Sequence, residues 1–305
     1  MAQVICLLGP TASGKTDLAV SLYRRFPGRF ELISVDSALV YRGMDIGTAK
    51  PPPELLAEVP HHLIDIREPT QTYSAADFCD DAHDLIAGIL ARDCTPLLVG
   101  GTMLYFRSLL EGLAEMPAAD EALREKLLEE ASQLGWEHLH QRLQQVDPVA
   151  SQRIRPSDTQ RLQRALEVYE LTGRPISEFQ ADSARSWPYS TLQIGLFPPD
   201  RGALHLRIEQ RFHQMLEAGL VQEVEALKAR GDLHDALPAM RAVGYRQVWA
   251  YLEGGFSYDE MVYRGIVATR QLAKRQMTWM RSWPELNSIE TRPDVALQQT
   301  LKMLG

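Results

Sequence analysis

One segment near the N-terminus has the residue types and spacing of a phosphate-binding loop. It fits the pattern G-x-x-x-x-G-K-[ST] with Gly9, Pro10, Thr11, Ala12, Ser13, Gly14, Lys15 and Thr16. Glycines allow backbone N–H groups to converge on an anion, and Lys15 adds a mobile ammonium group at the start of a helix. The whole segment is predicted to bind a diphosphate or polyphosphate, with Mg²⁺ held through the Thr16 hydroxyl. Whether that phosphate is transferred or leaves is not decided by the motif.

Two polar residues are expected to face this loop, because each comes at the end of a predicted strand. Asp36 follows one buried apolar run directly, and Thr102 follows another across two glycines. Open α/β sheets bind their ligands at the carboxyl ends of the strands. A carboxylate there can accept a proton from a nucleophile or help to hold a metal. Two structural alternatives stay open, namely that Asp36 caps a turn with Ser37 and that Thr102 caps the next helix.

The elements that position these residues alternate between strands and helices. Apolar runs of strand length predict buried strands at 4–8, 31–35 and 96–99, and helices are expected at 15–26 and 74–93. This alternation is typical of a parallel sheet with right-handed crossovers. The predicted fold class is α/β, a P-loop NTPase-like parallel sheet core with an inserted helical domain and a helical C-terminal region.

The pattern changes to helix after helix beyond residue 117, and the next strand is predicted at 191–197. We therefore predict a helical insertion at 118–186 and a core domain made of 1–117 and 187–305. Within the insertion, Ser157 and Gln160 form an expected capping box, and Gly173 provides the stop of that helix. The C-terminal region is predicted to be helical almost to residue 283, with a last long helix that Ser257 caps.

Composition excludes several classes of protein. The 305 residues are 45% hydrophobic and 24% charged, which is typical of a folded globular chain. The net charge of 32 − 40 = −8 argues against a protein that is covered by nucleic acid. The charge is unevenly distributed, however, with 5 − 16 = −11 over residues 51–130 and 7 − 3 = +4 over residues 241–281. A local basic surface is therefore possible near the C-terminus.

Cysteine usage and hydropathy indicate the compartment. Cys6, Cys79 and Cys94 are an odd number without C-x-x-C spacing, so neither a disulfide framework nor a zinc knuckle is expected. No signal peptide is recognisable, and no apolar run approaches the roughly 18 residues that span a bilayer. We expect a cytoplasmic protein with no membrane partner. Because no long exposed apolar stripe stands out, we expect a monomer.

Five blocks of sequence resemble the tRNA dimethylallyltransferases, also called tRNA isopentenyltransferases, of the bacterial type. The blocks occur in the family's order at 9–16, 36–51, 99–105, 243–247 and 269–276. The resemblance implies transfer of a dimethylallyl group from dimethylallyl diphosphate to N6 of adenosine 37, in tRNA anticodon stem-loops with A36-A37-A38. Diphosphate is released and Mg²⁺ is required. The family pattern often has Gln where Leu39 stands and Gly where Met103 stands, which leaves the local base contacts open.

The resemblance also implies roles for single residues. Asp36 corresponds to the general base near the adenine N6, and Thr102 to a catalytic residue that positions this base. Arg207 and Arg211 lie four residues apart on one helical face and are expected to bind the diphosphate, and the resemblance favours at least Arg211. The alternative for both arginines is a solvated helix face paired with Glu209 and Glu217.

The RNA is expected to contact three parts of the chain. The residues assigned to it, by resemblance or as members of a basic face in the C-terminal region, are Ser37, Ala38, Leu39, Arg124, Gln160, Arg161, Arg164, Arg241, Gly244, Tyr245, Arg246, Lys274, Arg275, Gln276 and Arg281. Because a stacked base must be extracted from its loop, basic and aromatic side chains are useful on one face. The alternative is an ordinary solvated basic face whose aromatic residues lie in the core.

Three other functions are considered beside tRNA prenylation. A P-loop small-molecule kinase would use the same loop for ATP. A prenyltransferase that acts on free adenine nucleotides would not need the basic C-terminal helix. A nucleotide-gated RNA-binding module would bind RNA without turning over a prenyl diphosphate.

Overall fold

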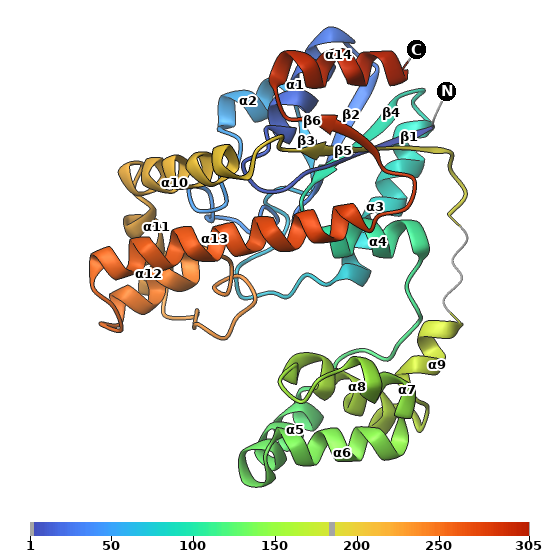
Figure 1. Cartoon of the computed structure of the whole chain (residues 1–305), viewed down its shortest axis with the longest axis vertical. Helices are drawn as coiled ribbons and strands as arrows, with labels where there is room; N and C mark the ends of the chain where they lie inside the picture. Colours follow the sequence, from blue (N-terminus) through green and yellow to red (C-terminus); the bar gives the residue numbers. More distant parts are fainter. Residues whose placement is uncertain (1–2, 183–186, 305) are drawn as a thin grey trace. The chain divides into compact units, whose positions relative to one another are not determined.

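The apolar runs of the sequence form the strands of one parallel sheet (Figure 1). The computed structural model describes residues 3–182 and 187–304. Strands β1 (Val4–Leu8), β2 (Phe30–Val35), β4 (Thr95–Gly100) and β5 (Thr191–Phe197) lie within one residue of their predicted bounds. The strand order is β3-β2-β4-β1-β5-β6, with neighbouring strands parallel. The predicted α/β class is confirmed.

Two edge strands were not predicted. The strand β3 (His61–His62) is only two residues long, and β6 (Asn287–Glu290) has a single buried side chain, that of Ile289. Neither segment has the apolar run or the alternation by which a strand can be recognised. Both pair with a neighbour because the sheet already offers an edge.

Helices cover both faces of this sheet and extend beyond it. Their bounds in this part of the chain are α1 (Lys15–Arg25), α2 (Pro53–Glu58), α3 (Ala75–Leu90), α4 (Met103–Glu111), α10 (Arg201–Glu217), α11 (Leu220–Ala229), α12 (Tyr245–Leu252), α13 (Tyr258–Arg281) and α14 (Pro293–Leu304). The capping box expected at Ser74 is present, since Ser74 and Asp77 each accept a hydrogen bond from the other's amide. Helix α14 was not predicted. Among the described residues, no helix combines the length and the apolar character needed to cross a membrane.

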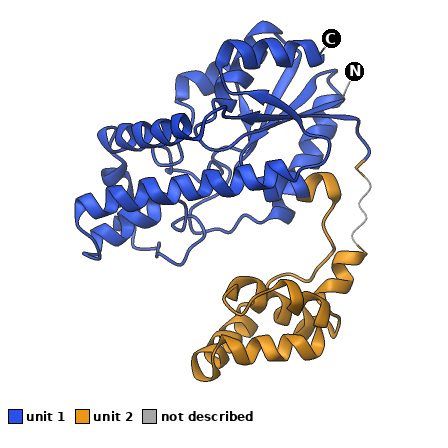
Figure 2. Ribbon diagram, viewed as in Figure 1, with its two compact units in different colours: residues 1–107, 188–305 blue, residues 108–187 orange. Residues whose placement is uncertain are grey.

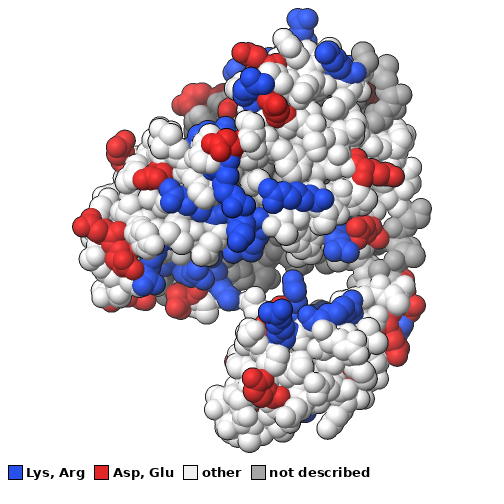
Figure 3. All heavy atoms as spheres, viewed as in Figure 1, with Lys and Arg blue, Asp and Glu red and all other residues white. Residues whose placement is uncertain are grey.

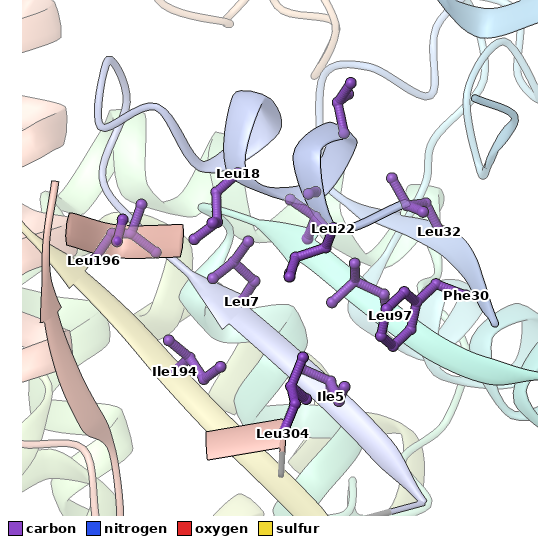
Figure 4. Packing of buried hydrophobic residues seen from close by; sticks show 14 of the residues in the cluster. Ile5, Leu7, Leu18, Leu22, Phe30, Leu32, Leu97, Ile194, Leu196 and Leu304 are labelled. Atoms are coloured by element: carbon purple, nitrogen blue, oxygen red, sulfur yellow. The ribbon is translucent and has the colours of Figure 1, made fainter. Parts of the chain in front are cut away.

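The main core lies between the sheet and the helices α1 and α14 (Figure 4). Leu18 and Leu22 of α1 pack with Leu7 of β1 and Leu97 of β4, and Leu304 of α14 closes the cluster. Each such buried leucine contributes roughly 1.5–3 kcal/mol relative to an exposed one. The packing fixes the carboxyl ends of the strands, where the site residues begin.

A second compact unit comprises residues 108–187 (Figure 2). It consists of α5 (Glu121–Leu134), α6 (Trp136–Val146), α7 (Pro148–Arg153), α8 (Thr159–Thr172) and α9 (Ile176–Ala181) around its own apolar core. The unit begins at residue 108, within α4 and earlier than the predicted residue 118. Met116 packs on its core, and Arg164 donates to the carbonyl oxygen of Pro117. The predicted boundary at 186 lies outside the described residues.

One cap in this unit differs from the prediction. Asp158, not Ser157, is the N-cap of α8, and its carboxylate accepts from the amide of Arg161 at 3.4 Å. Two good capping residues are adjacent here, and the one nearer the helix is used. The stop at Gly173 is confirmed, with a φ of 68° in the left-handed region. Ser257 caps α13 as predicted, by accepting from the amide of Glu260.

Candidate active site

The register of three strands brings the predicted catalytic residues to one rim of the sheet. Gly100 of β4 is paired with Leu8 of β1 on one side and with Val35 of β2 on the other. A Cβ atom at residue 100 would lie 1.9 Å from the carbonyl oxygen of Val35, so only glycine fits. The phosphate loop, Asp36 and Thr102 each begin one or two residues beyond these paired positions. The sequence prediction that they share a rim is confirmed.

The backbone of the phosphate loop leaves a group of amides for a ligand. Three amides are already engaged by protein acceptors, those of Gly9, Thr11 and Ser13, and Pro10 has none. The amides that have no acceptor within the described part of the chain are those of Ala12, Gly14, Lys15 and Thr16. The Ser13 hydroxyl is buried and likewise has no partner among those residues. Such unpaired donors at a helix N-terminus suit an anion with several oxygen atoms.

Two cations and one carboxylate act on each other beside this loop. Burial lowers the pKa of Lys15 to about 8, while Asp36 acts to raise it and Arg211 to lower it. Burial also lowers the pKa of Arg211, which Asp36 and Asp17 act to raise. Each group therefore lies within electrostatic reach of the other two. The positive charges of Lys15 and Arg211 are poorly solvated, which favours binding of a multivalent anion.

The carboxylate of Asp36 is held by one of its two oxygens. Its Oδ1 accepts from the amide of Ala38 at 2.9 Å and from that of Leu39 at 3.4 Å. The turn-capping alternative is thus present in the structure. Its Oδ2 has no hydrogen-bond donor among the described residues, so this oxygen can still accept a proton from a substrate. The turn orients the carboxylate for the role that the resemblance implies.

Thr102 is joined to the residue next to Asp36. Its hydroxyl group accepts a hydrogen bond from the amide of Ser37 at 3.1 Å and donates one to the Ser37 hydroxyl at 3.4 Å. Thr102 links the ends of β4 and β2, and in this way positions the turn that contains Asp36.

The polar loop at 36–51 is held by hydrogen bonds to Glu223 of α11, a residue far from it in the sequence. The carboxylate of Glu223 accepts from the amides of Asp45, Ile46 and Gly47 at 2.9, 2.7 and 3.1 Å. The hydroxyl of Tyr245 donates to the same carboxylate at 2.5 Å. The prediction that Tyr245 contacts RNA is wrong, because the side chain is 0% exposed and bonded to Glu223. Nothing in the sequence pattern singles out Glu223.

A buried lysine fixes the far end of the same loop. The side chain of Lys50 is only 4% exposed, and its Nζ lies 2.5 Å from a carboxylate oxygen of Asp45 and of Asp65. It also donates to the carbonyl oxygen of Tyr41 at 2.9 Å. Sequence reasoning did not single out Lys50, because a lysine in a polar loop normally extends into solvent.

We expect Glu223→Gln to destabilise the protein by about 1–3 kcal/mol, because an amide group would face backbone donors that a carboxylate satisfies. Thermal and denaturant unfolding measure this. Glu225→Gln is the matched control, since it makes the same change at an exposed position of the same helix. Equal stability of the two variants would contradict the anchoring role of Glu223.

The two predicted diphosphate arginines separate in the structure. Arg211 belongs to the electrostatic group around Lys15, whereas Nη2 of Arg207 lies 3.4 Å from Oγ1 of Thr291, just beyond β6. Glu209 pairs with Arg270 at 2.7 Å, so the alternative in which it neutralises Arg207 or Arg211 is not what the structure shows. Arg207 has a buried Nε without a hydrogen-bond partner among the described residues, so diphosphate binding stays a prediction for both arginines.

Part of the predicted RNA surface is formed by exposed cations. Of the five cations predicted to contact RNA in the C-terminal region, all are exposed. Arg246, Lys274, Arg275 and Arg281 have no carboxylate partner among the described residues, whereas Arg241 interacts with another group of the protein. Lys and Arg side chains gather on the face of residues 1–107 and 188–305 along which α10 and α13 lie (Figure 3). On α13 an open pocket of about 430 Å³ is lined by Gln271, Lys274, Arg275, Thr278 and Trp279. Uncompensated charge beside an aromatic ring suits a nucleic-acid strand.

Two other predicted RNA ligands have structural contacts. Gly244 is buried at a φ of 96°, where it begins α12, and its amide donates to Oε1 of Gln247. Gln276 of α13 bonds to the phosphate loop and to Gly101 through the two ends of its side-chain amide. The prediction of a direct RNA contact is therefore corrected for Gly244, which offers neither a side chain nor a free amide. Gln276 is already engaged by protein groups.

In the second unit, two of the four predicted RNA ligands surround a buried carboxylate. Arg124 and Arg164 both bond to Glu167, which is 0% exposed, at distances of 2.7–3.2 Å. These bonds pair the buried carboxylate, but two guanidinium groups against one carboxylate leave a net positive charge. The side chains of Arg124 and Arg164 are 41% and 28% exposed, so RNA contact stays a prediction for them. Gln160 and Arg161 are exposed, and the guanidinium of Arg161 forms a surface ion pair with Asp158 at 3.3 Å. RNA contact stays a prediction for Gln160 and Arg161.

The residues at the rim fit a Mg²⁺ ion that is bound mainly by its substrate. The described residues contain no group of three or more His, Cys, Asp or Glu side chains that could hold a metal by themselves. The half-buried Thr16 hydroxyl stands at the start of α1, beside the unpaired loop amides. Mg²⁺ commonly takes one or two protein oxygens and completes its shell with phosphate oxygens and water. The donor set therefore fits the prediction for Thr16.

Comparison with known proteins gives consistent matches over most of the chain. A sequence model of the family described as IPP transferase matches residues 39–283. A curated tRNA dimethylallyltransferase from Thiobacillus denitrificans is 59% identical over 294 residues, covering 96% of this chain and 93% of that protein. The crystal structure of the tRNA isopentenylpyrophosphate transferase of Bacillus halodurans is 37% identical, with a TM-score of 0.71, covering 100% of this chain and 94% of that one.

A more distant structure has the same fold. A eukaryotic dimethylallyltransferase, in crystallographic snapshots of its action on tRNA, superposes with a TM-score of 0.81 at 24% identity, covering 99% of this chain and 78% of that one. The matches to the family model and to the curated relative extend across both compact units. The chain therefore belongs to the IPP transferase family, the family of the tRNA dimethylallyltransferases.

Proposed function

We propose that this transferase moves a dimethylallyl group from dimethylallyl diphosphate to N6 of adenosine 37 in tRNAs with A36-A37-A38. Prenylation of tRNA follows from the family, and the donor and the position in the anticodon loop are part of the proposal. The observation that supports it most is the placement of Lys15 and Arg211 with Asp36 at one rim. Diphosphate ligands thus lie beside a carboxylate with one free oxygen.

The reaction needs both kinds of group. A bond forms between N6 of adenine and C1 of the allyl group, while the bond from C1 to the diphosphate oxygen breaks. The exocyclic amine is a poor nucleophile because its lone pair is delocalised into the ring, so Oδ2 of Asp36 takes the N6 proton as the bond forms. The loop amides, Lys15 and Arg211 stabilise the charge that gathers on the leaving diphosphate. Mg²⁺, held through Thr16 and the diphosphate oxygens, would neutralise part of this charge.

The acceptor adenine must leave the stack of its loop to reach Asp36. Extraction costs a few kcal/mol, which contacts with the RNA backbone and with stacked bases have to offset. The exposed cations of α13 and the ring of Trp279 support this role, and the ring is held by Arg107 of α4 at 5.8 Å. The predicted monomeric state and cytoplasmic location stay predictions from the sequence.

Lys274→Ala and Arg275→Ala are each expected to weaken binding of an anticodon stem-loop and to reduce the slope of log K against log salt by about 1. A titration at several salt concentrations measures both effects. Arg264→Ala is the matched control on the same helix, because Arg264 is already neutralised by Glu260 at 2.6 Å. A slope that Lys274→Ala and Arg275→Ala leave unchanged would remove α13 from the RNA surface.

Mass analysis of nucleosides tests the function directly. The protein, Mg²⁺ and dimethylallyl diphosphate are incubated with an unmodified stem-loop that contains A36-A37-A38. We expect one dimethylallyl group on the central adenosine and one diphosphate released for each group transferred. Transfer to AMP but not to the stem-loop would select the prenyltransferase of free nucleotides, and hydrolysis or transfer of an ATP γ-phosphate would select the kinase.

A further inference from the structure

Gln276 connects two loops that are far apart in the sequence. Its Oε1 accepts from the amide of Thr11 at 2.9 Å, and its Nε2 donates to the carbonyl oxygen of Gly101 at 2.8 Å. The orientation of the side-chain amide follows from chemistry, because a backbone N–H needs an acceptor and a backbone carbonyl needs a donor. One half-buried side chain of α13 thus joins the phosphate loop to the turn between β4 and α4.

The turn is shaped to receive this side chain. A Cβ atom at residue 101 would lie 2.5 Å from Nε2 of Gln276 and 3.1 Å from the carbonyl oxygen of Gly9. Glycine at this position therefore lets α13 approach the rim. Among the described residues, one direct backbone hydrogen bond also joins the phosphate loop to the end of β4. In it the amide of Gly9 donates to the carbonyl oxygen of Gly100 at 3.2 Å.

Both loops that Gln276 joins carry groups of the reaction. Thr11 lies one residue before Ala12, whose amide is the first of those left for an anion, and Gly101 precedes Thr102, which positions the turn of Asp36. A shift of either loop relative to the other would change the distance between the bound diphosphate and the carboxylate of Asp36.

We propose that Gln276 is a positioning residue, which holds the phosphate loop in register with the turn of Thr102 and Asp36, and does not bind RNA. This inference rests on the proposed function, because it assigns a part in donor binding to one residue of the same site. It replaces the RNA contact that the resemblance implied for Gln276. Its exposed neighbours Lys274 and Arg275 retain that contact.

Gln276→Glu gives a test that depends on pH. An ionised glutamate can still accept from Thr11 but repels the carbonyl oxygen of Gly101, whereas a protonated glutamate can donate to it. Calorimetric titration with inorganic diphosphate and Mg²⁺ is done from pH 4 to 8 for the variant and the wild type, a range that includes the ordinary glutamate pKa of about 4.3. We expect the ratio of their Kd values to be about 10 at pH 7.5, where the carboxylate is ionised, and to fall toward 1 as the pH approaches 4, since the ordinary pKa of a glutamate is about 4.3. Because both proteins bind the same ligand at the same pH, the effect of diphosphate ionisation on Kd cancels in this ratio.

Gln271→Glu is the matched control. It adds the same charge to the same helix, at an exposed residue that lines the open pocket with Lys274. We expect it to weaken binding of the stem-loop and to leave the diphosphate ratio near 1 at every pH. Gln276→Glu and Gln276→Met are expected to weaken binding of diphosphate and to raise the KM for the donor. Their RNA affinity should stay within about twofold of the wild type.

Three results would overturn the positioning role. The first is diphosphate affinity of Gln276→Met and Gln276→Glu within twofold of the wild type, and the second is loss of RNA affinity without loss of diphosphate affinity. A pH-independent defect of Gln276→Glu would also contradict it, since misfolding is not repaired by protonating one carboxyl group. Failure of the proposed function has a different signature, because the wild type would then bind diphosphate without prenylating the stem-loop.

Discussion

Asp36→Asn is expected to lower the single-turnover rate of prenyl transfer by about 10²- to 10⁴-fold, the usual range for loss of a general base. Asparagine can still accept from the amides of Ala38 and Leu39 through its side-chain oxygen, so the turn is retained. Only the ability to take the N6 proton is lost. Rapid-quench measurement with protein in excess over the stem-loop reports the rate, and a binding titration reports RNA affinity, which we expect to be unchanged.

Asp36→Ala serves as the comparison, because it removes the turn together with the base. We expect it to lose the same turnover and to weaken RNA binding as well, since Ser37, Ala38 and Leu39 follow directly. A full single-turnover rate in Asp36→Asn would exclude the general base. Equal RNA affinity in the two variants would show that the turn has no part in RNA binding.

Lys15→Met is expected to weaken diphosphate binding by about 10²- to 10³-fold, which is typical of removing one donor that faces a developing anion. In the wild type we expect the affinity of the free protein for diphosphate to fall as the pH rises above about 8, the pKa to which burial lowers Lys15. The sign follows from linkage, because the anion binds the protonated lysine and the neutral form gains nothing from it. The loss should approach tenfold per pH unit.

Calorimetric titration between pH 7 and pH 9.5 checks both parts of this prediction. The decline above pH 8 should be absent from Lys15→Met, which has no ammonium group to lose. Lys302→Met is the control, because Lys302 is exposed on α14. If Lys15→Met kept the same decline with pH, the titrating group would have to be a different one.

Local chemistry is what the sequence reveals most directly. The phosphate loop needs its glycines, lysine and hydroxyl in a fixed order within one short segment, and buried parallel strands need continuous apolar runs. The strands β1, β2, β4 and β5 and the residues at their ends could therefore be predicted. The strand β6 and the helix α14 could not, because their stability comes from the sheet edge and the core that they cover and not from their own pattern.

Pairing across long distances was decided by the tertiary structure alone. Arg124 and Tyr245 look like surface ligands in the sequence, but each is bonded to a carboxylate supplied by another helix. The bridge from Gln276 to Thr11 joins residues 265 positions apart. No pattern along the chain encodes such contacts, because a polar side chain has the same local signature whether water or a buried partner satisfies its hydrogen bonds.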